Sequence, residues 1–241
     1  MQNILHQLRS GGDDQFQSIY TVVPWLEWPV AHLSWEERLA GFEQLPDPRI
    51  FKTHCLYEQT PGVDTVKIIL TSRDPRDCCV SFYHHLLDMT DEARHRRGIT
   101  APESFDTYFD RWLSYGAWFR NVASWWPHIN DDNVLWLRYE DLKADFPAAL
   151  QRIGAFLGWT IPPESRSRIL EYCSFSWMKA HAEKFIRTDD DGQPMFRPGG
   201  FIRKGVSGDY HSLLRPEHEQ RILDKARQML PPECLAFLGI G

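Results

Sequence analysis

The sequence predicts an α/β domain with a mainly parallel sheet flanked by helices. Short apolar segments rich in β-branched residues alternate along the chain with longer segments of helical periodicity, as a parallel sheet with crossover helices requires. The length of 241 residues suits one domain, and a composition of 42% hydrophobic and 25% charged residues is that of an ordinary globular protein. We therefore expect residues 1–241 to form a single domain.

In the first half of the chain, local signals mark three helices and two strands. A glycine pair at 11–12 ends the first helix. Ser34 and Glu37 have the spacing of a capping box, and Asp74 followed by Pro75 suits an N-cap and a first helical position. The expected elements are a helix up to 11–12, an irregular stretch over 20–30, a helix over 34–45, strands over 49–52 and 65–71, and a helix over 75–88.

In the second half of the chain, a polar segment separates the expected helix over 75–88 from the helices that follow. Residues 88–100 are polar and of mixed charge, so we expect a mobile loop, which is either a lid beside the chemistry or a plain surface excursion. Asp141 is the expected cap of a later helix. The expected elements are helices over 104–114 and 116–126, a strand over 133–137, helices over 141–158, 163–171 and 175–182, an irregular stretch over 187–209 and a last helix from about 216.

Composition and charge disfavour several classes of protein. The net charge of −6 argues against a nucleic acid partner, so an anionic ligand must meet a local basic cluster. No apolar run approaches the roughly 20 residues of a membrane span, and the N-terminal sequence lacks the pattern of a secretory signal. Five cysteines without paired spacing favour reduced thiols and no metal, so we expect a cytoplasmic protein.

The first candidate site follows the expected strand over 49–52. Lys52 and His54 lie two residues apart, where a cation can stabilise developing charge and an imidazole can accept a proton near neutral pH. A solvated lysine and a histidine bonded to a loop carbonyl explain the same residues, because this spacing is common.

The second candidate site lies where the strand over 65–71 meets the next helix. Arg73 stands at the strand end, the helix N-terminus is positively polarised, and Ser81 adds a hydroxyl about two turns further on. A guanidinium in this setting suits a phosphate, which it can bind bidentately. A capped helix with an Asp/Arg surface pair is the alternative.

The third candidate site is the stretch 197–210, which combines four glycines with three cationic side chains. Glycine allows backbone amides to approach a phosphate, and the cations supply charge. An ordinary surface loop is the alternative, but cations clustered in an acidic chain favour an anion site.

These three stretches, in this order, resemble motifs of the cytosolic sulfotransferase family, whose members use 3′-phosphoadenosine 5′-phosphosulfate (PAPS). The resemblance spans nearly the whole chain. Two departures are Cys55-Leu56 after the first motif and Tyr210 in place of a tryptophan. The matching segments are KTH at 52–54, RDPRDCCVSFYHH at 73–85, SYGAWFRNVASWW at 114–126, YEDL at 139–142, CSFSWMK at 173–179 and FIRKGVSGDY at 201–210.

The resemblance implies a P-loop NTPase-like sulfotransferase fold. It also implies transfer of a sulfuryl group from PAPS to a hydroxyl or amine of a small acceptor, with PAP as the product and no metal. His54 then corresponds to the general base and Lys52 to the cation near the transferring group. The residues implied for the cofactor are Arg73, Ser81, Tyr139, Ser174, Phe175, Phe201, Ile202, Arg203, Lys204 and Gly205. Aromatic side chains near these segments favour an apolar or aromatic acceptor, although a packed core explains them equally well.

The family's first strand and 5′-phosphosulfate-binding loop have no counterpart in the sequence, so we expect a domain that is N-terminally truncated relative to the family. Three explanations stay open: a misassigned start, a fragment, or a short form with little transfer activity. A beginning in mid-helix without an N-cap favours the first. The dimer motif of many relatives is not matched at 211–217, which leaves the oligomeric state open.

Three functional hypotheses follow. The first is a PAPS-dependent sulfotransferase. The second is an inactive or regulatory remnant that binds PAP, PAPS or a protein partner without turnover. The third, a small-molecule kinase, is disfavoured because the sequence contains no GxxxxGKS/T motif and no evident magnesium ligand.

Overall fold

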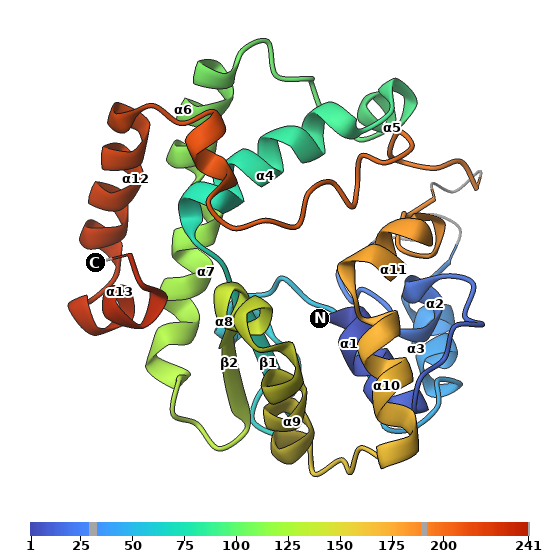
Figure 1. Ribbon diagram of the computed structural model, residues 1–241. Helices are drawn as coiled ribbons and strands as arrows, with labels where there is room; N and C mark the ends of the chain where they lie inside the picture. Colours follow the sequence, from blue (N-terminus) through green and yellow to red (C-terminus); the bar gives the residue numbers. More distant parts are fainter. Residues whose placement is uncertain (29–32, 189–191, 241) are drawn as a thin grey trace. The chain divides into compact units, whose positions relative to one another are not determined.

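A computed structural model describes residues 1–28, 33–188 and 192–240 of the protein (Figure 1). The chain divides into two compact units. Unit 1 consists of Met1–His54, Met89–Arg97 and Gly158–Arg203, and unit 2 consists of Cys55–Asp88, Gly98–Leu157 and Lys204–Gly241. The expected irregular stretches 20–30 and 187–209 lie partly outside the described residues.

Unit 2 contains the sheet. Strands β1 (Ile68–Ser72) and β2 (Val134–Arg138) pair in parallel, with Ile68 opposite Val134 and Ser72 opposite Arg138. The two strands are confirmed within a few residues of their expected bounds, and so is their parallel pairing. The expected extent of the sheet is too large, because the sheet formed by the described residues has two strands.

Helices make up most of the rest of unit 2, and they enclose an aromatic core. Phe109, Phe119, Trp125 and Ile222 are almost completely buried and share this core with Trp136 of β2. The helices are α4 (Pro75–Asp88), α6 (Phe105–Tyr115), α7 (Ala117–Trp125), α8 (Tyr139–Ala144), α9 (Phe146–Leu157), α12 (Pro216–Met229) and α13 (Pro232–Leu238). Short 3-10 helices are η1 (Tyr57–Gln59), η2 (Trp126–His128) and η4 (Asp209–Ser212).

Unit 1 is helical and has a smaller core. Phe16, Ile19, Val23, Ile50 and Phe185 form its buried apolar cluster. Its helices are α1 (Gln2–Ser10), α2 (Ile19–Val22), α3 (Trp35–Glu43), α5 (Asp91–Arg96), α10 (Pro163–Tyr172), α11 (Phe175–Ala180) and the 3-10 helix η3 (Ala182–Lys184). In the described parts of the chain, no helix combines the length and the apolar character that a membrane span needs.

Several helix boundaries confirm the local signals. Gly11 ends α1 with φ 71°, a left-handed conformation that glycine adopts without strain. The capping box of α3 is complete: the Ser34 hydroxyl accepts the Glu37 amide, and the Glu37 carboxylate accepts the Ser34 amide. Asp74 Oδ1 accepts the Arg76 amide at 2.8 Å in the first turn of α4.

The expected strand over 49–52 is wrong. In unit 1, Lys52 forms a single parallel bridge with Trp25. The Lys52 amide donates to Pro24 O at 2.8 Å, and the Leu26 amide donates to Lys52 O at 2.9 Å. Pro24 has no amide hydrogen with which to continue the ladder, and the chain turns directly after Trp25, where the Trp28 amide donates to Trp25 O.

Four expectations about helices are corrected. The segment 88–100 contains α5, whose first turn is capped because the Thr90 hydroxyl accepts the Ala93 amide at 3.2 Å. The expected helix over 141–158 is two helices, α8 and α9, which are interrupted at Asp145. Asp141 is not a cap, because α8 begins at Tyr139 and Asp141 lies inside it. Helix α13 follows the expected last helix and ends at Gly239, where φ is 71°.

Candidate functional site

Arg73 lies in the turn from β1 to α4 in unit 2, where hydrogen bonds fix its own backbone and the side chain of the preceding residue. Trp118 Nε1 of α7 donates to Arg73 O at 3.1 Å. Trp136 Nε1 of β2 donates to the Ser72 hydroxyl at 3.0 Å, and this bond is buried. Two indole donors from different elements therefore fix the end of the strand from which the guanidinium extends.

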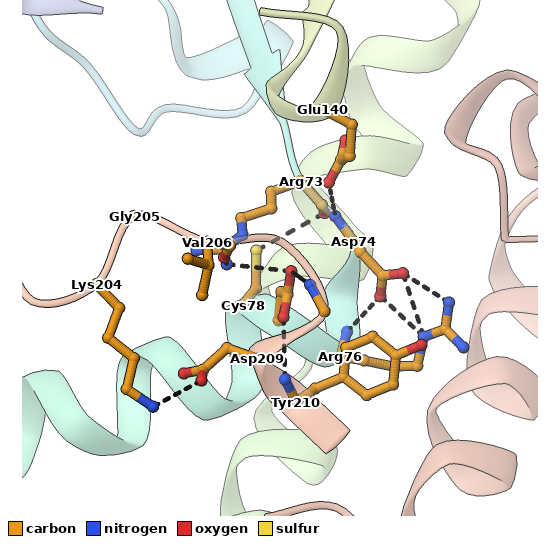
Figure 2. Close-up of polar contacts among 12 residues, drawn as sticks. Arg73, Asp74, Arg76, Cys78, Glu140, Lys204, Gly205, Val206, Asp209 and Tyr210 are labelled. Carbon is orange, nitrogen blue, oxygen red and sulfur yellow. Dashed lines mark hydrogen bonds and ion pairs between the residues drawn. The ribbon is translucent and has the colours of Figure 1, made fainter. Parts of the chain in front are cut away.

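The Arg73 side chain is largely buried, and its guanidinium lies between three groups. Nη2 donates to Val206 O at 2.7 Å and pairs with Asp77 Oδ2 at 3.1 Å (Figure 2). The guanidinium carbon lies 4.8 Å from the centre of the Tyr139 ring, within the range of a cation–π contact. Arg73 Nε is buried, and no described residue accepts a hydrogen bond from it. The guanidinium therefore keeps at least this donor for a ligand.

The segment 204–210 lies beside this turn and is tied to it from several sides (Figure 2). Lys143 Nζ of α8 donates to Gly205 O at 2.6 Å, and Gly205 has φ 63°, which favours glycine. Lys204 pairs with Asp209 at 2.8 Å while half of its side chain remains exposed. The segment therefore brings a second cation to the surface of unit 2.

Two further expected residues of unit 2 lie on neighbouring helices. Tyr139 is the first residue of α8, directly after β2, and burial raises the pKa of its hydroxyl while the Arg73 charge opposes this. Ser81 is half-buried on α4, and its hydroxyl has no hydrogen-bond partner among the described residues. Arg73, Tyr139, Lys204 and Gly205 are thus grouped within unit 2, with Ser81 on the helix that follows Arg73.

In unit 1, Lys52 and His54 both lie against one indole. Lys52 Nζ is 4.0 Å from the centre of the Trp25 ring, and the His54 and Trp25 ring centres are 4.7 Å apart. Trp25 also contacts Trp28, and the centres of these two rings are 4.9 Å apart. The spacing in the sequence therefore places the cation and the imidazole on a shared aromatic support.

Burial and charge lower the pKa values of both groups. Desolvation lowers the pKa of Lys52 to about 8, and Glu27 acts in the opposite direction. Desolvation, followed by the charge of Lys52, lowers the pKa of His54 to about 4, again against Glu27. Part of the His54 side chain is exposed, and contact with water limits the size of its shift. The direction leaves the imidazole neutral at pH 7 and Lys52 mostly protonated.

Glu27 also fixes the backbone on which the imidazole stands. Its Oε1 accepts the His54 amide and, at 2.9 Å, the Thr53 hydroxyl. Among the described residues, no side-chain hydrogen bond reaches the His54 ring. Trp25 Nε1 beside it is buried, and no described residue accepts its hydrogen bond.

The remaining expected residues all belong to unit 1. Ser174 caps α11, because its hydroxyl accepts the Trp177 amide at 3.1 Å. Phe175 is 38% exposed, so an aromatic face is available to solvent. Phe201 and Ile202 pack against the apolar cluster of unit 1. Arg203 O accepts Lys179 Nζ at 3.3 Å, so the backbone beside this arginine is tied to α11.

Two residues of these sites were not predicted from the sequence. Asp77 stands within the quoted segment 73–85, four residues after Arg73, which is the spacing of a helical ion pair. Lys143 is one helical turn after Tyr139, at the same kind of spacing. Trp25 is one of the aromatic side chains that we expect near the acceptor, but its contact with Lys52 and His54 could not be predicted, because it depends on the bridge between Trp25 and Lys52.

Comparison with known proteins assigns the chain to a family. The sulfotransferase domain family matches residues 1–230. The chain belongs to this family. Its members are PAPS-dependent enzymes. The sulfotransferase fold is confirmed by a solved sulfotransferase structure, which matches 98% of the chain.

Named relatives extend this assignment. Sulfotransferase 1A1 of the dog is 28% identical over 219 residues, which cover 88% of the chain and 71% of the relative. Sulfotransferase 6B1 of the chimpanzee is 30% identical over 223 residues, which cover 89% and 67%. The crystal structure of mouse sulfotransferase SULT7A1 complexed with PAP matches the chain with a TM-score of 0.70 at 25% identity. The match covers 98% of the chain and 83% of the mouse protein in that structure.

A second solved structure supports the fold. The structure of retinol dehydratase in complex with androsterone and the inactive cofactor PAP matches the chain with a TM-score of 0.72 at 23% identity. The match covers 96% of the chain and 78% of the retinol dehydratase chain. At this identity the likeness concerns the fold.

Proposed function

We propose that the chain transfers a sulfuryl group from PAPS to a hydroxyl or amine of a small, apolar or aromatic acceptor. The observation that carries this proposal is the guanidinium of Arg73, which is held on three sides and keeps a buried Nε donor that bonds to no described residue. A buried donor of this kind has lost its hydration, and an anionic oxygen restores a strong, charge-assisted hydrogen bond.

The residues around Arg73 fit a nucleotide with a 3′-phosphate. Arg73, Ser81 and Lys204 supply donors of the type that phosphate accepts, and Gly205 lets the backbone approach it closely. Tyr139 offers a ring for the adenine. We also propose cofactor-binding roles for five residues of unit 1, because their segments resemble motifs of the family; they are Ser174, Phe175, Phe201, Ile202 and Arg203. When bound, PAPS supplies an activated sulfuryl group and leaves as PAP.

His54 suits the role of general base. Its pKa lies below neutral pH, so the ring is unprotonated where the enzyme works and can accept the proton of an acceptor hydroxyl on a ring nitrogen. The Glu27 carboxylate holds the backbone of His54 and leaves the ring itself free. Lys52, with a pKa near 8, keeps a positive charge at pH 7 and stabilises the negative charge that develops during transfer.

Trp25 and Trp28 support the proposed acceptor class. Their rings pack on each other next to His54, so an apolar or aromatic acceptor would find an indole surface beside the base. The five cysteines are all free, as suits the proposed cytoplasmic location.

The test is a transfer assay with [35S]PAPS and a panel of phenols, sterols, glycolipids and amines. The unchanged chain should label at least one acceptor class. His54→Ala should lower transfer by about 100-fold or more, the size of a general-base contribution, and leave PAP affinity within about twofold. His95→Ala is the matched control, because His95 is an exposed histidine on α5 of the same unit, and it should retain full transfer.

Two outcomes would contradict the proposal. Full activity of His54→Ala removes His54 from the mechanism. PAP binding without labelling of any acceptor class favours the regulatory remnant over the enzyme.

A further inference from the structure

We propose that Asp77 is a positioning residue that gives the nucleotide site of unit 2 its preference for a 3′-phosphate. The inference rests on the proposed function, because it adds a residue to that same site. Asp77 itself touches no part of the expected ligand; it acts through Arg73 and through the segment 204–210.

The Asp77 carboxylate is buried and bonded on both oxygens. Its side chain is 1% exposed in the first turns of α4. Oδ2 accepts the Gly208 amide at 2.9 Å and pairs with Arg73 Nη2 at 3.1 Å, and Oδ1 accepts the Tyr210 amide at 3.1 Å (Figure 2). An ionised carboxylate at such depth persists only when donors of this kind compensate its lost hydration.

These bonds join two segments that are far apart in the sequence. One carboxylate ties the turn that carries Arg73 to Gly208 and Tyr210, which lie 131 and 133 residues further along the chain. The joined segment also carries Lys204 and Gly205, two further expected phosphate ligands of unit 2. Asp77 therefore sets the position of both halves of the phosphate site with respect to each other.

The same carboxylate orients the guanidinium. Arg73 Nη2 is held between Asp77 Oδ2 and Val206 O, and these contacts occupy one edge of the planar group. The Nε atom is left as a buried donor with no acceptor in the part of the chain that the structure describes. Without the carboxylate, the guanidinium loses a fixed partner and two loop amides lose their acceptor, so the donors no longer converge.

Asp74 provides a matched comparison on the same helix turn. Its carboxylate is also largely buried, with 15% exposure, and pairs with an arginine, Arg76, at 2.6 Å. It accepts the Arg76 amide but no hydrogen bond from Arg73 or from the segment 204–210. If Asp77 served only the stability of α4, the same substitution at either position would have the same effect on ligand preference.

The experiment measures the affinities of PAP and adenosine 5′-monophosphate by calorimetry for the unchanged chain, Asp77→Asn and Asp74→Asn. The two nucleotides differ in the 3′-phosphate. The unchanged chain should prefer PAP by at least tenfold. Asp77→Asn should weaken PAP binding about tenfold or more and leave the monophosphate within about twofold, whereas Asp74→Asn should keep the preference. An unchanged preference in Asp77→Asn, or an equal loss for both nucleotides, would overturn the inference.

A second measurement does not depend on the folding of a variant. Hydrogen exchange of the unchanged chain should show the Gly208 and Tyr210 amides protected with and without PAP, because both donate to a buried carboxylate. Exchange at the rate of an open loop would overturn the anchoring role. Absence of PAP binding to the unchanged chain would overturn the proposed function and the inference with it. PAP binding with an unaltered preference in Asp77→Asn overturns the inference alone.

Discussion

Replacing Lys52 by methionine removes a charge that lowers the pKa of His54. Desolvation is the larger cause of the low pKa, the Lys52 charge is the second, and Glu27 opposes both. Methionine keeps an apolar stem of similar length against Trp25, so the packing changes little. The substitution should therefore raise the pKa of His54 towards its ordinary value.

The size of the change follows from the shared contact with Trp25. Lys52 Nζ lies 4.0 Å and the His54 ring 4.7 Å from the Trp25 ring, so the two groups are within about 9 Å of each other. At that separation the repulsion is about 0.5 kcal/mol in a medium like water and about 1.8 kcal/mol at an effective dielectric constant of 20. The pKa of His54 should rise by about 0.3 to 1.4 pH units.

The assay is an NMR titration of the His54 ring in both proteins, with His54→Gln to assign the resonance. Lys184→Met is the control, because Lys184 is also a cation near an aromatic ring of unit 1, 5.1 Å from Phe16. A His54 pKa that stays constant or falls in Lys52→Met, or that rises equally in the control, would refute this reasoning. Because His54 stays mostly neutral at pH 7 in either case, a loss of transfer at that pH measures the role of the Lys52 charge itself.

Three further predictions concern stability and the thiols. Arg73→Ala leaves buried Asp77 without its ion-pair partner and should lower stability by about 3 kcal/mol, or Tm by about 6–12 °C, and calorimetric scans should show no further stabilisation by PAP. Ser34→Ala removes half of the capping box of α3 and should lower the free energy of unfolding in urea by about 1 kcal/mol. Burial raises the pKa of four thiols to about 12, and the three that belong to buried residues should react with a thiol reagent at pH 8 only as the chain unfolds; they are Cys79, Cys173 and Cys234. Fast labelling of these thiols in the native protein would contradict their burial.

Local signals were sufficient where a helix end depends on one or two side chains. The capping box at Ser34, the Asp74–Pro75 start of α4 and the glycine stop after α1 all act within a few residues. The structure confirms each of them, because such bonds form in the same way in any tertiary context.

Elements that depend on distant partners were harder to predict. The segment 49–52 has the composition of a strand, but its neighbour at Trp25 follows Pro24 and offers one bridge only. The polar composition of 88–100 suggested a loop, yet the cap at Thr90 supports the short helix α5, and Arg94 Nη1 adds a buried bond to Met89 O at 2.7 Å. Polar composition alone therefore did not predict α5, a short helix that its own side chains stabilise.

The candidate sites show the same division. The residues Lys52, His54 and Arg73 could be named from motifs, because their types and order suit the chemistry. The partners that hold them could not, since Asp77 reaches amides more than 130 residues away and Trp25 reaches Lys52 and His54 through side-chain packing. Motifs predict which residues could take part in the chemistry, and the fold supplies the groups that position them.

The most direct test of the central claim is a calorimetric titration of the chain with PAP, and separately with ATP, each with magnesium and with EDTA. We expect saturable binding of PAP to one site, at least tenfold tighter than that of ATP, unaffected by EDTA and lost in Arg73→Ala. Absence of PAP binding, or tighter binding of ATP that requires magnesium, would contradict it.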